Sequence, residues 1–173
     1  MSAGPACGMG GALLDPEQRS VEWYTPPHIF AALGISFDLD PCAPVGGVPW
    51  IPAAAHYSRE DDGLKRPWDG RVWLNPPYGR EAALWVDRLV QHGDGIALVF
   101  SRTDAAWFQR AAAAADAVCF IAGRLSFVAG TLLQQQRGHN AAAGSVLLAF
   151  GRGNAGALRR CGLGLVYESE GSR

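Results

Sequence analysis

The stretch that decides the fold reads Arg71-Val72-Trp73-Leu74-Asn75-Pro76-Pro77-Tyr78-Gly79 and leads into a predicted helix over 80–91. Residues 71–74 are mostly apolar and β-branched or aromatic, which is typical of a buried strand. The two prolines end that strand, because neither ring has an N–H to donate to a sheet. Apolar residues then recur at helical spacing. A strand, a stiff turn and a helix in this order predict a βα unit.

Strands and helices alternate on both sides of this unit. The pattern predicts strands over 36–40, 71–74, 95–100, 117–121, 145–150 and 164–167, with 124–128 extending the sheet, and helices over 25–34, 80–91 and 104–115. Thr25 and Asp104 are expected to cap their helices, and Gly34 to end the first one. Residues 42–69 and 130–144 are predicted to be irregular loops. The alternation predicts an α/β fold with a mostly parallel sheet covered by helices on both faces.

Length and composition predict one globular domain. The chain has 173 residues, of which 49% are hydrophobic and 18% charged. We expect a domain over 21–168, with a flexible tail over 1–20 and a short tail over 169–173. The longest apolar run is far below the roughly 20 residues that span a bilayer, and no signal peptide is visible. A cytoplasmic protein with no membrane contact is therefore expected.

Cysteine and charge patterns restrict the function further. The four cysteines are far apart, which excludes a zinc ribbon or a C-x-x-C redox motif, so no metal site is expected. The net charge is −1, yet residues 100–160 carry seven basic groups, all arginine, against two acidic ones. Arginine is well suited to bind phosphate, so this block is either a surface that faces a polyanion or ordinary surface charge.

Two polar segments follow predicted strands, at the edge where ligands of such sheets bind. One is Asp38-Leu39-Asp40-Pro41-Cys42-Ala43, and the other is Asn75-Pro76-Pro77-Tyr78. In the second, the Asn75 oxygen and the Pro76 carbonyl can accept two N–H groups of a planar amino ligand, while Tyr78 covers its flat face. The alternative is a rigid turn with a structural tyrosine.

These segments resemble a known family. Asn75-Pro76-Pro77-Tyr78 resembles the catalytic motif of S-adenosylmethionine-dependent amino-methyltransferases, and Thr25-Pro26-Pro27 resembles their Thr-Pro cofactor element. A wider set of motifs, spread from Trp23 to Phe150, resembles the phage-type (Dam-like) DNA N6-adenine methyltransferases. The set comprises Trp23-Tyr24-Thr25-Pro26, Phe37 to Ala43, Tyr57, Asp61-Asp62-Gly63-Leu64, Trp68, Val72 to Tyr78, Trp85-Val86, Trp107-Phe108 and Gly123 to Phe127.

The resemblance implies a single Rossmann-like methyltransferase domain that is an adenine-specific, site-specific DNA-methyltransferase. Its cofactor is S-adenosylmethionine and its partner is DNA. The implied catalytic residues are Asn75, Pro76 and Tyr78. The implied cofactor-binding residues are Tyr24, Thr25, Pro26, Asp38, Asp40, Cys42 and Asp62. The implied DNA-binding residues are Pro77, Arg102 and Arg124.

Several alternatives stay open from the sequence. The loop after the first strand, Pro41 to Gly47, lacks the usual glycine-rich pattern, which leaves individual cofactor contacts undecided. Asp62 can equally be a solvated acid, and Arg102 and Arg124 can form surface ion pairs instead of phosphate contacts. The amino acceptor can also be an RNA base or a protein amide, or the chain can be a non-catalytic DNA-binding module. The loop over 134–140 is the candidate for sequence recognition.

Overall fold

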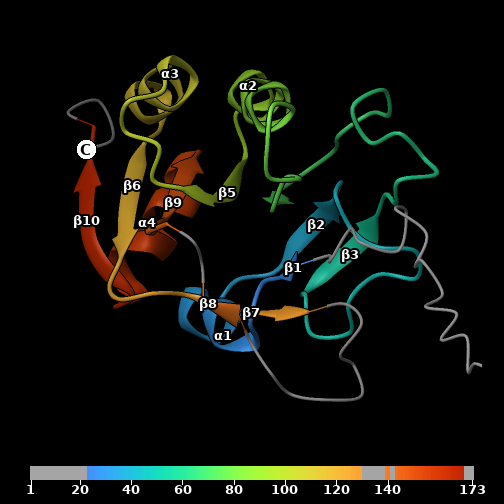
Figure 1. The fold of residues 1–173 in the computed structure, drawn as a ribbon, viewed down its shortest axis with the longest axis horizontal. Helices are drawn as coiled ribbons and strands as arrows, with labels where there is room; N and C mark the ends of the chain where they lie inside the picture. The colour runs from blue at the N-terminus through green and yellow to red at the C-terminus, as the bar shows by residue number, and fades with distance from the viewer. Residues whose placement is uncertain (1–22, 130–138, 141–142, 170–173) are drawn as a thin grey trace, which may run out of the picture.

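The computed structural model describes residues 23–129, 139–140 and 143–169 (Figure 1). Its elements, in chain order, are β1 (Trp23–Tyr24), α1 (Pro27–Leu33), β2 (Phe37–Asp40), β3 (Ala53–His56), β4 (Val72–Leu74), α2 (Ala82–His92), β5 (Gly95–Phe100), α3 (Ala106–Ala114), β6 (Ala117–Ile121), β7 (Ser126–Ala129), β8 (His139–Asn140), β9 (Ser145–Phe150), α4 (Arg152–Arg160) and β10 (Gly164–Glu168). The predicted tail over 1–20, residues 170–173 of the second tail, and 134–138 of the candidate recognition loop lie outside the described residues.

The main sheet is mixed. Its seven strands run in the order β10-β6-β9-β5-β4-β2-β3. The four strands β3, β2, β4 and β5 pair in parallel, whereas β9 pairs antiparallel with both β5 and β6, and β10 pairs antiparallel with β6. The prediction of an α/β fold is confirmed, but the prediction of a mostly parallel sheet is wrong for the half that contains β9 and β10.

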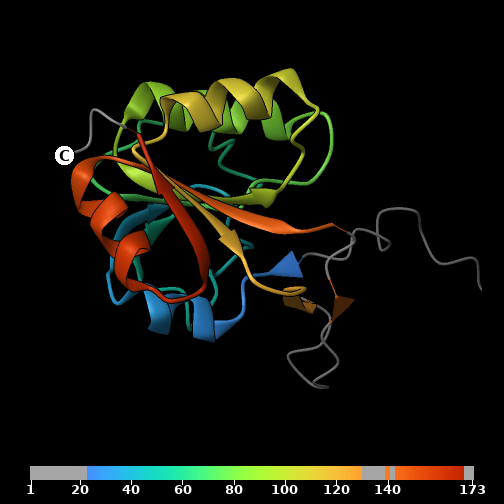
Figure 2. The same ribbon diagram turned by 90° about the vertical axis from the view of Figure 1, so that its left-hand side faces the viewer.

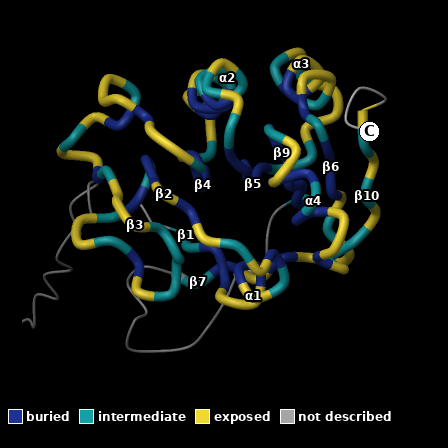
Figure 3. Tube along the Cα trace, turned by 180° about the vertical axis from the view of Figure 1, so that it is seen from behind, coloured by how far each residue is buried: buried dark blue, intermediate teal, exposed yellow. Residues whose placement is uncertain are grey.

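Helices cover both faces of this sheet, as predicted. Figure 2 shows α2 and α3 on one face and α1 and α4 on the other. Ile29, Phe30 and Leu158 from α1 and α4 pack around Trp73 in one core, and Val86 and Phe108 from α2 and α3 build the second core. The central strands are buried along almost their whole length (Figure 3). Burial on both faces explains why these strands read as continuous apolar runs.

Some local predictions are wrong. Residues 42–69 are not all irregular, since they contain β3, and the helix α4 was not predicted. The segment over 124–128 does not extend the main sheet, because β7 joins β1 and β8 in a separate three-stranded sheet. Thr25 and Asp104 do not cap their helices, whose N-cap residues are Pro26 and Ala105 without side-chain bonds. Gly34 ends α1 in the left-handed conformation (φ 62°), as expected.

The strand order has a switch point between β2 and β4, where a ligand crevice is expected. β2 leads to β3 on one side, whereas β4 leads to β5 on the other side, so the connections leave in opposite directions. In open α/β sheets ligands bind outside the carboxyl ends of the strands at such a switch point. Asp40 ends β2 and Asn75 follows β4, so both predicted segments meet at this crevice. Within the described residues, no helix combines the length and apolar character that crossing a membrane requires.

Candidate active site

The side chain of Asn75 has a fixed orientation. Its Nδ2 donates a hydrogen bond of 3.0 Å to the carbonyl of Trp23, which belongs to β1 of the three-stranded sheet. Because a carbonyl can only accept, this contact identifies the amide nitrogen and leaves Oδ1 on the opposite side. That oxygen accepts a hydrogen bond of 3.2 Å from the Tyr78 hydroxyl. Asn75 therefore presents an acceptor toward Tyr78, as a ligand with an amino group requires.

Tyr78 lies among aromatic rings. Its ring stacks on Phe100 with a centroid distance of 4.1 Å and an interplanar angle of 9°. Phe127 lies nearly perpendicular to it at 5.9 Å. Burial raises the pKa of the Tyr78 hydroxyl, which keeps that group a neutral donor. One face of Tyr78 is thus occupied by Phe100, which limits where a planar ligand can stack.

Asp40 is a buried acid at the end of β2. Its side chain is only 4% exposed, and its Oδ1 accepts a hydrogen bond of 3.1 Å from the backbone N–H of Cys42. Burial raises the pKa of this carboxyl group to about 7, although the bond from Cys42 partly opposes the shift. Burial, together with the negative charge of Asp40, also raises the pKa of the Cys42 thiol well above its usual value. Cys42 therefore remains a neutral thiol beside a carboxyl that titrates near neutral pH.

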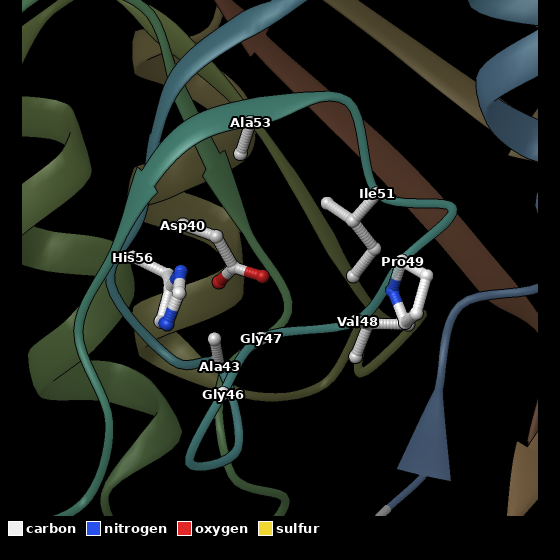
Figure 4. A pocket seen from close by; sticks show the side chains of 9 residues that line it. All are labelled: Asp40, Ala43, Gly46, Gly47, Val48, Pro49, Ile51, Ala53 and His56. Atoms are coloured by element: carbon white, nitrogen blue, oxygen red, sulfur yellow. The ribbon is translucent and has the colours of Figure 1, made fainter. Parts of the chain in front are cut away.

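A cavity of about 230 Å³ opens beside Asp40. In Figure 4 the Asp40 carboxyl group points into this space, with His56 on one side and Pro49 and Ile51 on the other. A second hollow of about 380 Å³ adjoins it, since Ala43 lines both. The hollow beside Asp40 is smaller than the roughly 300–1,000 Å³ typical of small-molecule sites, and the second hollow alone falls within that range. The walls combine apolar side chains with a few polar groups, which is the usual make-up of a cofactor site.

The predicted Thr-Pro element lies next to the Asn75 turn. Thr25 is fully buried, and its hydroxyl has no hydrogen-bond partner among the described residues. Its carbonyl accepts a bond of 2.8 Å from the indole N–H of Trp50. Tyr24 is half-buried and meets Trp50 edge to face, while Pro26 is buried and caps α1. A buried hydroxyl without a partner costs free energy, which is recovered when a ligand supplies the bond.

Of the seven predicted cofactor residues, Asp40 lines the cavity, whereas Tyr24, Thr25, Pro26, Asp38, Cys42 and Asp62 do not. Asp38 and Asp62 have other partners. The Asp38 carboxylate accepts a hydrogen bond of 2.7 Å from the backbone N–H of Arg71, so it orders the turn that enters β4. Asp62 is exposed, has a φ of 54° and pairs with Lys65 at 2.6 Å. Neither residue lines the cavity. Their roles as cofactor contacts stay predictions, with less support than that of Asp40.

The predicted DNA contacts follow strands that end at the same edge of the main sheet as β4. Pro77 is exposed beside Asn75, Arg102 is exposed after β5, and Arg124 is exposed after β6. β5 and β6 both pair antiparallel with β9, so they run in the same direction and end at the same edge. Arg80, which was not predicted, is also exposed just after Tyr78. The structure thus places three arginines along the edge that holds Asn75.

Several residues that line the cavity were not predicted from the sequence. His56 ends β3, and Val48, Pro49 and Ile51 come from the loop before that strand. Once β3 is recognised, His56 stands at a strand end like Asp40, which is the signal that could have identified it. In the described part of the chain, no three His, Cys, Asp or Glu side chains gather as a metal site would require.

The comparisons with known proteins give one family. A protein-family model described as DNA N-6-adenine-methyltransferase (Dam) matches residues 14–156. This match spans the Asp40 segment, the Asn75 turn and the whole of the core that contains Val86, and it leaves out Leu158 and Cys161 of the other core. No curated protein and no solved structure shows a significant match.

Proposed function

The chain belongs to the DNA N-6-adenine-methyltransferase (Dam) family, and from this premise we propose that it transfers a methyl group from S-adenosylmethionine to the N6 amino group of adenine in DNA. The observation that carries the proposal is the fixed amide of Asn75, whose oxygen faces Tyr78 at the same crevice as Asp40 and its cavity. We also propose that the α/β domain is Rossmann-like, since its parallel half has a switch point between β2 and β4.

The residues around the cavity fit S-adenosylmethionine. This cofactor combines a flat base, ribose hydroxyls, and a methionine part with positive and negative charges. Val48, Pro49 and Ile51 offer apolar contact to the base, and an ionised Asp40 attracts positive charge. Thr25 does not line this cavity, but its unpartnered hydroxyl, two residues from the Trp23 carbonyl that holds Asn75, offers a further polar contact. When bound, the cofactor provides an activated methyl group, so the protein needs to position the acceptor more than to activate the donor.

Asn75 and Pro76 hold the acceptor nitrogen. The lone pair of the adenine amino group is delocalised into the ring, which makes N6 a poor nucleophile. The Asn75 Oδ1 and the Pro76 carbonyl accept its two N–H groups and stabilise positive charge that grows on the nitrogen during transfer. Because Nδ2 is already bound to Trp23, the amide cannot turn its donor side toward the base without losing that bond. The Asn75 amide is thus oriented before the substrate binds.

The adenine must leave the DNA stack to reach this turn. Tyr78 offers it an aromatic face, and stacking of a base on an aromatic side chain is worth roughly 1–3 kcal/mol. Since Phe100 covers one face of Tyr78, the base must stack on the opposite face or displace Phe100. Arg80, Arg102 and Arg124 along the same edge are suited to the phosphates that flank the flipped nucleotide.

Cofactor binding separates a catalyst from a DNA-binding module. We expect the protein to bind S-adenosylmethionine in a calorimetric titration, and Asp40→Ala to weaken that binding more than it weakens binding to DNA. A protein that binds DNA but not the cofactor would support the module instead. Equal cofactor affinity of parent and Asp40→Ala would move the charge contact to Asp38 or Asp62.

A further inference from the structure

Arg88, in the middle of α2, holds a loop from another part of the chain. Its guanidinium donates hydrogen bonds to the backbone carbonyls of Leu64 and Arg66. The same group lies over the ring of Trp68, 4.8 Å from the ring centre. All three partners belong to the segment over 57–68 that follows β3, here called the 57–68 loop. A planar guanidinium is suited to bind two carbonyls and stack on an aromatic ring at once.

Trp68 makes one contact within the 57–68 loop and one contact with α2. Its indole N–H donates a hydrogen bond of 2.9 Å to the carbonyl of Gly63. Its ring stacks on Trp85 of α2, at 6.2 Å and 20°. Trp68 is buried, so these contacts are shielded from water. The loop is therefore attached to α2 through Arg88 and through the pair of tryptophans.

The other side of the loop contacts the residues around Asp40. Gly63 is packed so tightly that an added Cβ would lie 2.3 Å from the carbonyl oxygen of Pro41. The backbone N–H of Tyr57 donates to the carbonyl of Asp40 at 2.9 Å, and the N–H of Ala43 donates to the carbonyl of Tyr57 at 3.0 Å. The segment from Asp40 to Ala43, which lines the cavity at both ends, is thus held by the loop on both sides of Pro41.

We propose that Arg88 is a positioning residue of the methyl-donor site: from α2 it holds the 57–68 loop against the segment that carries Asp40. This inference rests on the proposed function, because it takes the cavity beside Asp40 as the cofactor site. The helix that carries Arg88 begins shortly after the Asn75–Tyr78 turn. One rigid helix therefore connects the turn that holds the acceptor with the loop that supports the donor site (Figure 1). Arg88 and Trp68 set how the two halves of the site face each other.

Two conservative variants test this role. Arg88→Lys keeps the charge but loses the fork that reaches two carbonyls, and Trp68→Phe keeps an aromatic ring but loses the donor to Gly63. Arg110→Lys is the matched control, since Arg110 lies on α3 and pairs with Asp87 at 3.3 Å, outside the loop. We expect the dissociation constant for S-adenosylmethionine to rise at least fivefold in both test variants and to stay within twofold of the parent in the control.

A kinetic measurement distinguishes positioning from general damage. At saturating cofactor, kcat of both test variants should stay within about threefold of the parent, while KM for the cofactor rises with the dissociation constant. Amide hydrogen exchange without cofactor should show faster exchange at Tyr57 and Ala43 in Arg88→Lys than in Arg110→Lys. If Arg88→Lys does not fold, Trp68→Phe carries the test alone.

The outcomes separate this inference from the function that it rests on. Faster exchange with unchanged cofactor affinity would show that Arg88 only stabilises the loop, which overturns the positioning role. Parent-like affinity and exchange in both variants overturn it as well, while the proposed function stands. A parent protein that does not bind S-adenosylmethionine overturns the proposed function and this inference together.

Discussion

The amide of Asn75 owes its orientation to a residue 52 positions earlier in the chain. Trp23 belongs to the small sheet, and its carbonyl holds the Asn75 Nδ2 at 3.0 Å. The acceptor oxygen therefore faces Tyr78 without any ligand present. An acceptor that is oriented in advance stabilises developing charge without reorganisation at the moment of reaction.

Substitutions in this turn should separate catalysis from binding. Asn75→Ala removes an acceptor that acts mainly in the transition state, so the methylation rate should fall by at least about 10²–10³ while cofactor affinity stays unchanged. Tyr78→Phe loses a hydroxyl but keeps the ring on Phe100, so it should retain much of the activity. Tyr78→Ala should lie between these two. Single-turnover rates at saturating cofactor measure the order, and near-parent rates for Asn75→Ala would contradict the role of this residue.

The buried carboxyl of Asp40 predicts a specific pH dependence. Its pKa is about 7 in the folded protein and about 3.8 when unfolded, so the folded state binds the extra proton between these values. The stability of the cofactor-free protein should therefore fall as pH rises from about 4 to 7, by up to about 4 kcal/mol from this group. Asp40→Asn removes this titrating group. The free energy of unfolding of the variant, relative to that of the parent, should therefore be higher at pH 8 than at pH 5. Urea unfolding at both pH values measures this, and an equal difference at each pH would argue against a raised pKa.

At the scale of the elements, the carboxyl ends of β4, β5 and β6 bring Arg80, Arg102 and Arg124 to one edge. Each arginine that neutralises a phosphate should contribute about 0.9 to the slope of log affinity against log salt. Arg102→Ala should therefore reduce both DNA affinity and this slope. Arg152→Ala is the control, because Arg152 follows the end of the oppositely directed β9 and lies at the other edge of the sheet. The result that speaks against a phosphate contact is an equal slope for Arg102→Ala and the control, measured by fluorescence anisotropy across a salt series.

Elements with strong apolar runs could be predicted from the sequence, and weakly patterned ones could not. The bounds of β5, β6 and β9 agree with the prediction, because each is an apolar run. β5 and β9 are buried over almost their whole length, and β6 is buried over its first three residues. β3 consists of three alanines and a histidine, mostly exposed at the edge of the sheet, so it has no alternation to detect. α4 contains two glycines, which disfavour helices, and it is stabilised instead by packing of residues such as Leu158.

The residues of the candidate site likewise divide into those that the sequence pattern indicates and those that it does not. Asp40 and Asn75 could be singled out as candidates because each stands at the end of a strand that the sequence pattern shows clearly. His56 could not, since its strand was not recognised. Asp38 was expected to contact the cofactor, but the sequence does not show that the backbone N–H of Arg71 donates to its carboxylate. The contact from Trp23 to Asn75 joins distant residues, and no local pattern indicates it.

At the scale of the whole molecule, the antiparallel position of β9 between β5 and β6 was beyond the sequence, because residue pattern does not encode strand direction. The parallel half, from β3 to β5, holds Asp40 at the end of β2 and the Asn75 turn after the neighbouring β4. The proposed methyl transfer therefore requires the methyl donor and the acceptor base to bind at the same switch point of the main sheet. The product of the reaction tests this requirement.

The most direct measurement is mass spectrometry of nucleosides from unmethylated DNA incubated with the protein and isotope-labelled S-adenosylmethionine. We expect labelled N6-methyladenine with the parent protein. With Asn75→Ala, at equal cofactor occupancy, the amount of labelled N6-methyladenine should be near background. RNA and protein substrates are incubated in parallel. Label on cytosine, label only in RNA or protein, or undiminished N6-methyladenine with Asn75→Ala would contradict the claim that Asn75 and Pro76 hold the amino group of a DNA adenine for methyl transfer.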